Sequence, residues 1–131
     1  MSSHPIVLHI QMIDHLNNDL TQSYELPAQY HHHPRTLSYT EKDKTTKVDF
    51  VIGESTLSLN RSAAWLTQIT FNLNGLGSFR VLSELGEMHG LVKLIASHIE
   101  THRIYLHYQL ILADSVITHQ TLIYTIRGAQ V

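Results

Sequence analysis

The sequence contains no cysteine, which excludes disulfide bonds and cysteine-based metal or redox chemistry. It also lacks an excess of either charge: the formal net charge is −2, so a basic face with general affinity for nucleic acid is not expected. Hydrophobic residues make up 43% and charged residues 15%, a composition typical of a globular core. At 131 residues the chain fits one domain, and we expect 1–131 to form it.

Long hydrophobic runs are missing as well. The apolar residues of the first segment are interrupted by His9 and Gln11, and no basic leader precedes them. We therefore predict neither a signal peptide nor a membrane span. The absence of cysteine is typical of a reducing compartment, so we expect a cytoplasmic protein.

Motifs that carry catalysis are absent too. There is no nucleophile elbow, no phosphate-binding loop and no cysteine nucleophile. Ser, His and Asp residues are present, but they indicate nothing without geometry. We expect a protein that is not an enzyme and that needs no cofactor.

Histidine is the residue that the chain has in excess, with 11 copies. Protonation of all of them would change the formal charge from −2 to +9, so a pH-responsive regulator is one hypothesis and a solvated histidine surface is the simpler interpretation. His31 and His33 would share one face of a strand and could both reach a zinc ion. Because the sequence offers no evident third ligand, these two are weak candidates and no metal site is expected.

Alternation of apolar and polar residues runs through most of the chain and predicts strands. The predicted strands cover 6–12, 24–30, 35–41, 48–52, 57–61, 65–73, 79–84, 91–99, 104–112 and 116–126. A helix is the alternative for 82–99, but Gly86 and Gly90 would each weaken it by about 1 kcal/mol, and we favour an irregular link bracketed by these two glycines and followed by the strand 91–99. Such a meander has two exposed edges unless it closes. The predicted fold is all-β: a single antiparallel meander closed into a barrel of about 8 to 10 strands.

Matching of apolar faces across the turns predicts which residues lie opposite each other. The predicted pairs are Ile6–Tyr30, Ile10–Leu26, Leu37–Phe50, Tyr39–Val48, Val48–Arg61, Ile52–Leu57 and Phe71–Phe79. Proline cannot donate to a strand ladder, so Pro27 is expected at a bulge or on an unpaired side.

These registers place an acid, a base and two aromatic residues around one mouth of the barrel. The four residues are Tyr39, Glu41, Arg61 and Trp65, with Trp65 opposite Arg61. In one hypothesis Arg61 binds a ligand carboxylate or phosphate bidentately while Tyr39 or Trp65 stacks on the ligand. In the alternative, which we favour, Arg61 closes the barrel end as a structural partner of Glu41 and of nearby carbonyl groups.

A resemblance to a known family rests on the order and spacing of short motifs. These are Tyr39-x-Glu41, two strands ending in Arg61, Phe71, Gly90 and Tyr108-x-Leu110-x-Leu112. Over 6–127 the chain resembles the YwiB-like family of uncharacterised bacterial proteins, which is placed with the calycins, the lipocalin-like barrels. The family's Y-x-T-P-Y-G segment is replaced at 85–90 by LGEMHG. The resemblance implies a calycin-like barrel in a cytoplasmic bacterial protein, and it carries no known activity.

The function predicted from the sequence is binding of a small anionic or amphipathic molecule near Arg61. The alternative is a structural or protein-interaction module, a homodimer included, whose interior is filled by aromatic side chains and which responds to pH through its histidines. The interior volume distinguishes the two hypotheses, because only the first requires an open pocket near Arg61.

Overall fold

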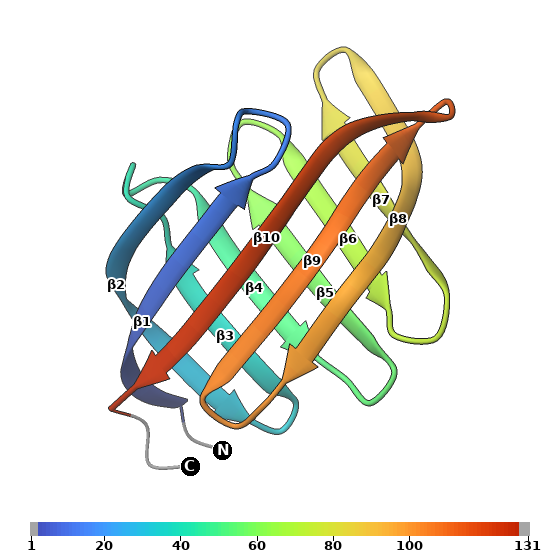
Figure 1. The fold of residues 1–131 in the computed structure, drawn as a ribbon. Helices are drawn as coiled ribbons and strands as arrows, with labels where there is room; N and C mark the ends of the chain where they lie inside the picture. The colour runs from blue at the N-terminus through green and yellow to red at the C-terminus, as the bar shows by residue number, and fades with distance from the viewer. Residues whose placement is uncertain (1–2, 129–131) are drawn as a thin grey trace.

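The computed structural model describes residues 3–128, which form ten antiparallel strands. Their bounds are β1 Ser3–Asp14, β2 Leu20–His32, β3 Arg35–Thr40, β4 Lys47–Ile52, β5 Thr56–Ser62, β6 Leu66–Asn72, β7 Leu76–Ser83, β8 Gly86–Ile99, β9 Arg103–Leu112 and β10 Ser115–Arg127. Each strand pairs with its neighbours in the sequence, and β1 pairs with β10, so the meander closes into a barrel (Figure 1). The predicted all-β barrel is confirmed. Within the described range, no helix has the length and hydrophobicity to cross a membrane.

The segment 82–99 is not a helix, and 86–90 is not an irregular link. Gly86 begins β8 directly after the turn that follows β7, and Gly90 lies inside β8 opposite Phe79. The expected link at these glycines is therefore wrong, because both residues belong to a continuous strand.

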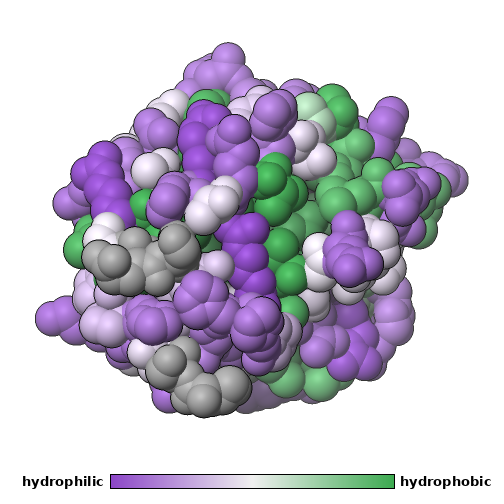
Figure 2. Space-filling view, turned by 90° about the horizontal axis from the view of Figure 1, so that it is seen from below, coloured by the Kyte–Doolittle hydropathy of each residue, from purple (hydrophilic) through white to green (hydrophobic). Residues whose placement is uncertain are grey.

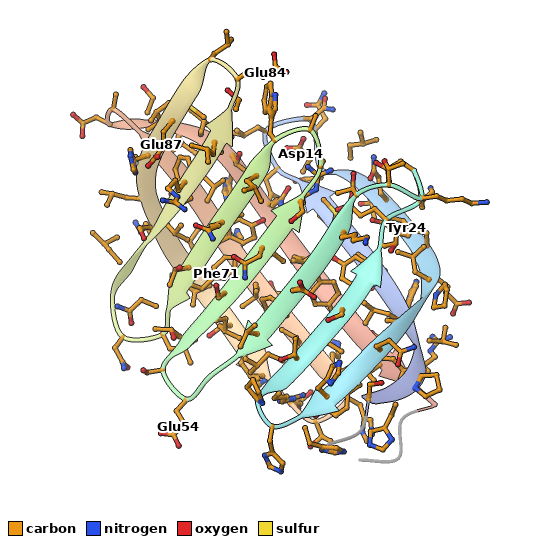
Figure 3. All side chains as sticks on the ribbon, turned by 180° about the vertical axis from the view of Figure 1, so that it is seen from behind. Asp14, Tyr24, Glu54, Phe71, Glu84 and Glu87 are labelled. Atoms are coloured by element: carbon orange, nitrogen blue, oxygen red, sulfur yellow. The ribbon has the colours of Figure 1, made fainter. Side chains whose placement is uncertain are left out.

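The turns alternate between two ends of the barrel. We call the end with the β1–β2, β3–β4 and β5–β6 turns the upper end, and the end with the β2–β3, β4–β5 and β8–β9 turns the lower end, as drawn in Figure 1. Figure 3 shows Asp14, Tyr24 and Glu84 toward the upper end and Glu54 at the lower end.

The interior is densely packed at its middle and toward its lower end. Because side chains alternate between the two faces of a strand, every second residue points inward. The largest of the fully buried side chains are Leu8, Ile10, Leu37, Phe50, Leu57, Phe71, Ile104, Leu106, Tyr108 and Tyr124, all with at most 2% of their surface exposed. The rings of Phe71 and Tyr108 meet edge to face at 4.9 Å, so aromatic groups occupy the centre of the barrel.

Arg35 spans the lower end. Its Nη2 donates to the carbonyl oxygens of Glu100 at 2.6 Å and Thr101 at 3.0 Å, and so ties the start of β3 to the β8–β9 turn. Beside it, Ile52, Leu73 and Ile99 line a shallow depression. Figure 2 shows this end as a hydrophobic strip between hydrophilic side chains. Contacts with carbonyl groups were predicted for Arg61, whereas the arginine that makes such contacts in the described structure is Arg35, at the opposite end.

The registers between 35 and 62 agree with the prediction. The observed pairs are Leu37–Phe50, Tyr39–Val48, Val48–Arg61 and Ile52–Leu57. The short turns and the strict alternation in this region leave little room for another register.

Three predicted registers are wrong by two residues: those of the β1–β2, β5–β6 and β6–β7 hairpins. In the first hairpin Ile6 lies opposite Ala28, not Tyr30, and Ile10 lies opposite Tyr24, not Leu26. A shift of two keeps the same side chains on the same face, so face matching alone cannot detect it.

Another such shift is in the β6–β7 hairpin. Phe79 lies opposite Ile69, and Phe71 lies opposite Leu57 on the other neighbouring strand. The predicted Phe71–Phe79 pair is therefore not formed.

Pro27 is accommodated on an unpaired side. The β1–β2 register runs through Pro27 without a shift, which excludes the bulge, while the pairing of β2 with β3 reaches only Ala28. Proline lacks a backbone N–H group, and at Pro27 this costs no hydrogen bond because the pairing of β2 with β3 has already ended.

Gly90 is required by the packing of its neighbours. A Cβ atom at this position would lie 2.2 Å from Cε2 of Phe79 and 2.4 Å from the carbonyl oxygen of Ile111. The absence of a side chain lets the buried Phe79 ring lie directly over the backbone of β8.

We predict that Gly90→Ala destabilises the barrel by about 1–3 kcal/mol, because the added methyl group overpacks the core against a backbone oxygen. Gly75→Ala is the matched control, since its Cβ would meet only Nδ2 of Asn72, at 3.9 Å. Urea unfolding of both variants measures the free energies. Equal stability of the two variants would contradict this explanation of Gly90.

Candidate functional site

A pocket of about 320 Å³ opens from the barrel interior at the upper end. This volume is at the small end of the range for ligand sites. Its apolar walls are Met12, Val48, Leu59, Ile69 and Leu122. Its polar lining consists of Gln22, Tyr24, Tyr39, Glu41, Arg61, Thr67, Tyr108, Gln120 and Tyr124. The described upper end thus combines an apolar interior with a dense set of hydrogen-bonding groups.

Arg61 and Glu41 form a bidentate ion pair at the rim of this pocket. Arg61 Nε donates to Glu41 Oε2 and Nη2 donates to Oε1, each at 2.9 Å. The hydrogen bonds from Arg61 to Glu41 raise the pKa of the guanidinium, so it stays charged. The side chains are 45% and 23% exposed, and a pair so solvated contributes about 1 kcal/mol at most. The predicted pair is present, but it contributes little to stability.

The β3–β4 turn holds Glu41 in place. The Glu41 N–H donates to the carbonyl oxygen of Thr46 at 2.8 Å. Asp43 accepts from the backbone N–H groups of Thr46 and Thr45, at 2.8 and 2.9 Å, and from the Thr46 hydroxyl. These hydrogen bonds, led by those from Thr46, lower the pKa of Asp43 to about 2. The acidic partner of Arg61 is therefore presented by an ordered turn.

Tyrosine hydroxyl groups line the deep part of the pocket. Tyr39 and Tyr124 share a hydrogen bond of 2.6 Å between their hydroxyl oxygens, and Gln120 Nε2 donates to the hydroxyl of Tyr108. Burial raises the pKa of Tyr108 to about 12 and raises those of Tyr39 and Tyr124 as well. All three remain neutral phenols near pH 7, each able to donate or to accept a hydrogen bond.

Tyr24 forms part of the rim. The ammonium group of Lys42 lies 4.7 Å from the centre of the Tyr24 ring, within cation–π range. Burial and the nearby Glu41 carboxylate raise the pKa of Tyr24. The rim therefore carries two cationic groups, of Lys42 and Arg61, close to one carboxylate.

Trp65 does not line the pocket, so this part of the predicted site is wrong. It lies in the β5–β6 turn, where the Ala63 N–H donates to its carbonyl oxygen at 3.0 Å, and 57% of its surface is exposed. Thr67 is the residue opposite Arg61. The pairing of β5 with β6 is shifted by two residues from the predicted register, so the turn covers 63–65 and Trp65 lies in it instead of in a strand.

Several lining residues were missed by the sequence analysis. Tyr24, Tyr108, Gln120 and Tyr124 come from β2, β9 and β10, which are far from Arg61 in the sequence. These residues stand at inward-facing positions of their strands, which the alternating pattern could have indicated. Only closure of the barrel, however, brings these strands to the same pocket.

His31 and His33 do not share a strand face as predicted. β2 ends at His32, which pairs with Arg35, and His33 belongs to the following turn. His32 instead contacts His4 across the first hairpin, with ring centres 5.1 Å apart.

A different group of histidines converges on the outer face of the barrel. The metal-ligating atoms of His15, His107 and His119 all lie within 4.8 Å of one another. Partial burial, then the neighbouring His119 and His15, lower the pKa of His107. No local pattern in the sequence indicates this group, because its members are separated by up to 104 positions and no single strand carries two of them.

Replacement of one hydroxyl of the Tyr39–Tyr124 pair leaves the other buried without its partner. We predict that Tyr39→Phe and Tyr124→Phe each lower the free energy of unfolding by about 1–3 kcal/mol. The double variant should lose clearly less than the sum of the two, because both hydroxyls are then gone. Additive losses in a double-mutant cycle measured by urea unfolding would contradict the pairing.

The lowered pKa of His107 predicts a loss of stability in acid. Above about pH 6.5 this histidine is neutral in both the folded and the unfolded chain, whereas below it the unfolded chain takes up the proton first. The free energy of unfolding should therefore fall between pH 7.5 and pH 5.5. His15, His119 and Asp19 are the titratable groups of the cluster around it.

His107→Gln tests this prediction, because it should flatten that pH dependence relative to the unmodified chain. Urea unfolding at the two pH values measures it, and an undiminished fall in the variant would show that other groups are responsible.

Comparison with known proteins identifies a similar fold. No protein-family model matches the chain, and no curated protein matches it. The crystal structure of the YwiB protein from Bacillus subtilis is similar with a TM-score of 0.76, covering 98% of this chain and 94% of that protein, at 19% sequence identity. This likeness supports a YwiB-like fold for the chain, and at such identity it concerns the fold alone.

Proposed function

We propose that this protein is a barrel without catalytic activity that binds a small amphipathic molecule in the pocket at its upper end. One observation carries the proposal: about 320 Å³ of interior volume lies between apolar walls and the charged rim of Glu41 and Arg61. Ligand sites commonly combine an apolar cavity with a few polar groups that orient the ligand.

The pocket has a defined floor. Tyr108 and Tyr124 reach the deep part of its lining and are only 2% and 1% exposed, and the packed core around Phe50 and Phe71 continues below them. The interior is thus filled at the centre, as the alternative hypothesis expected, but not at the upper end. A ligand would enter only the upper part of the barrel.

The chemistry of the lining favours a ligand with an apolar body and one anionic or strongly accepting group. Leu59, Ile69 and Leu122 would contact the apolar body. A guanidinium has five N–H donors, and Glu41 engages one on Nε and one on Nη2. The remaining donors can bind an acceptor without displacing Glu41, so the ion pair would orient the guanidinium toward the ligand.

We also propose that the chain belongs with the YwiB-like proteins and the calycins, and that it acts in the cytoplasm. The spacing of its motifs and the shared fold support the first proposal. The absence of cysteine supports the second.

A second candidate function is interaction with another protein, a second copy of this chain included. It is favoured by exposed leucines near the upper end: Leu66 and Leu82 lie opposite each other and are 43% and 39% exposed, and Leu85 in the β7–β8 turn is 96% exposed. Contiguous exposed apolar groups of this kind mark interaction surfaces.

Binding of two fluorescent probes tests the first proposal. We expect 1-anilinonaphthalene-8-sulfonate, which is anionic, and N-phenyl-1-naphthylamine, which is neutral, to bind with a stoichiometry of one. Thr67→Phe should abolish the binding of both because its ring fills the pocket. Gln68→Phe is the matched control, since Gln68 is exposed on the outer face of the same strand.

Arg61→Ala separates the role of charge from that of the cavity. We expect it to weaken the anionic probe about tenfold, which corresponds to roughly 1.4 kcal/mol, and to leave the neutral probe unchanged. Unaltered binding of both probes by Thr67→Phe would contradict the pocket proposal. Loss of binding in Leu82→Ser instead would assign the probes to the exposed leucines and favour the second candidate.

A further inference from the structure

Three histidines from distant parts of the chain meet on the outer face of the barrel. His107 on β9 lies opposite Thr121 on β10, and His119 is two residues before Thr121 on the same face. His15 follows the last residue of β1, and its backbone N–H continues the ladder by donating to the carbonyl oxygen of His119 at 2.9 Å. The β1–β10 pairing that closes the barrel therefore also assembles this group.

The imidazole rings are close enough to share one ion. Nε2 of His107 and Nε2 of His119 are 2.8 Å apart, and the three ring centres are separated by 4.8 to 5.0 Å. Bonds of about 2.0–2.1 Å to a tetrahedral zinc ion place two ligand nitrogens about 3.3 Å apart. The observed separations of ligand atoms, from 2.8 Å to at most 4.8 Å, lie on both sides of that value. Small side-chain rotations suffice to bring all three nitrogens to an ion.

The partners of His15 orient it as metal-binding histidines are oriented. Its Nδ1 lies 2.7 Å from a carboxylate oxygen of Asp19, and its Nε2 lies 2.8 Å from the hydroxyl of Thr121. With the proton on Nδ1 held by the carboxylate, the lone pair of Nε2 accepts a hydrogen bond from the Thr121 hydroxyl, and a bond to an ion would take the place of this hydrogen bond. A carboxylate behind a ligating histidine is a recurrent feature of zinc sites, because it fixes the ring and increases its basicity.

We propose that His15, His107 and His119 form a binding site for one divalent transition-metal ion of the zinc type, with Asp19 as the positioning residue of His15. Imidazole ligands suit zinc, copper and nickel, whereas magnesium and calcium require oxygen ligands. All three histidines are half-buried, so a fourth coordination position faces solvent and takes water. The site is separate from the pocket, since His107, Thr121 and His119 point outward where Tyr108, Gln120 and Leu122 point inward.

Zinc binding to the untagged full-length chain tests the proposal. In competition with a chromophoric chelator we expect one zinc ion per chain, and we expect zinc to raise the melting temperature. His107→Gln and His119→Gln should each weaken zinc binding at least about tenfold. Cobalt(II) provides a second readout, because it should give the visible absorption of a tetrahedral complex in the unmodified chain and lose it in both variants.

Two further variants make the result specific. Asp19→Asn should weaken zinc binding about 10-fold to 100-fold, because it removes the charged partner of His15. His31→Gln with His33→Gln is the matched control for an unspecific histidine run, and it should leave the affinity unchanged. The melting temperature of each metal-free variant confirms that it is folded. Absence of binding at one ion per chain, or loss of binding only in the His31 and His33 variant, would overturn the proposal.

Discussion

The pairing of β1 with β10 is the contact on which the remaining structure depends. It runs from Val7 opposite Arg127 to Asp14 opposite Gln120 and pairs the two strands that would otherwise be the edges of the sheet. Because side chains alternate along each strand, this closure also fixes which face of every strand looks inward. The inward set forms both the packed core and the pocket, and the outward set brings the three histidines together.

The two ends of the barrel differ through their arginines. At the lower end Arg35 donates to two carbonyl oxygens of the β8–β9 turn and spans the opening. At the upper end Arg61 is held at the rim by Glu41, and the interior behind it stays open to a depth limited by Tyr108 and Tyr124. One arginine thus spans its end of the barrel, whereas the other lies at the rim of an open pocket.

Local patterns predicted much of this fold from the sequence. Alternation and short turns gave the all-β barrel, the pairs of 35–62 and the contact between Glu41 and Arg61. They failed where a shift of two residues keeps every face unchanged, as for Ile6, Trp65 and Phe79. The position of the turn decides such cases, and a single sequence constrains it weakly.

The functional groups that escaped prediction are those assembled by closure. Tyr124 and Gln120 reach the pocket, and His119 reaches His15, only because the last strand returns to the first. The register of β10 against β9 also shifts by one residue between Val116 and Thr118. This shift changes which residues of β10 face inward, and local patterns do not reveal it. Gly90 illustrates the same limit, since its need for space arises from Phe79 and Ile111 on the two neighbouring strands.

The central claim is that the upper end of the barrel is a binding pocket and not only the end of a packed core. The most direct measurement is an NMR titration of the folded chain with N-phenyl-1-naphthylamine that follows the side-chain amides of Gln22 and Gln120 and the Nε–H of Arg61. Saturable shifts of these three groups at one equivalent are the predicted result. Shifts confined to the backbone amides of Leu66, Leu82 and Leu85 on the outer surface would contradict the claim.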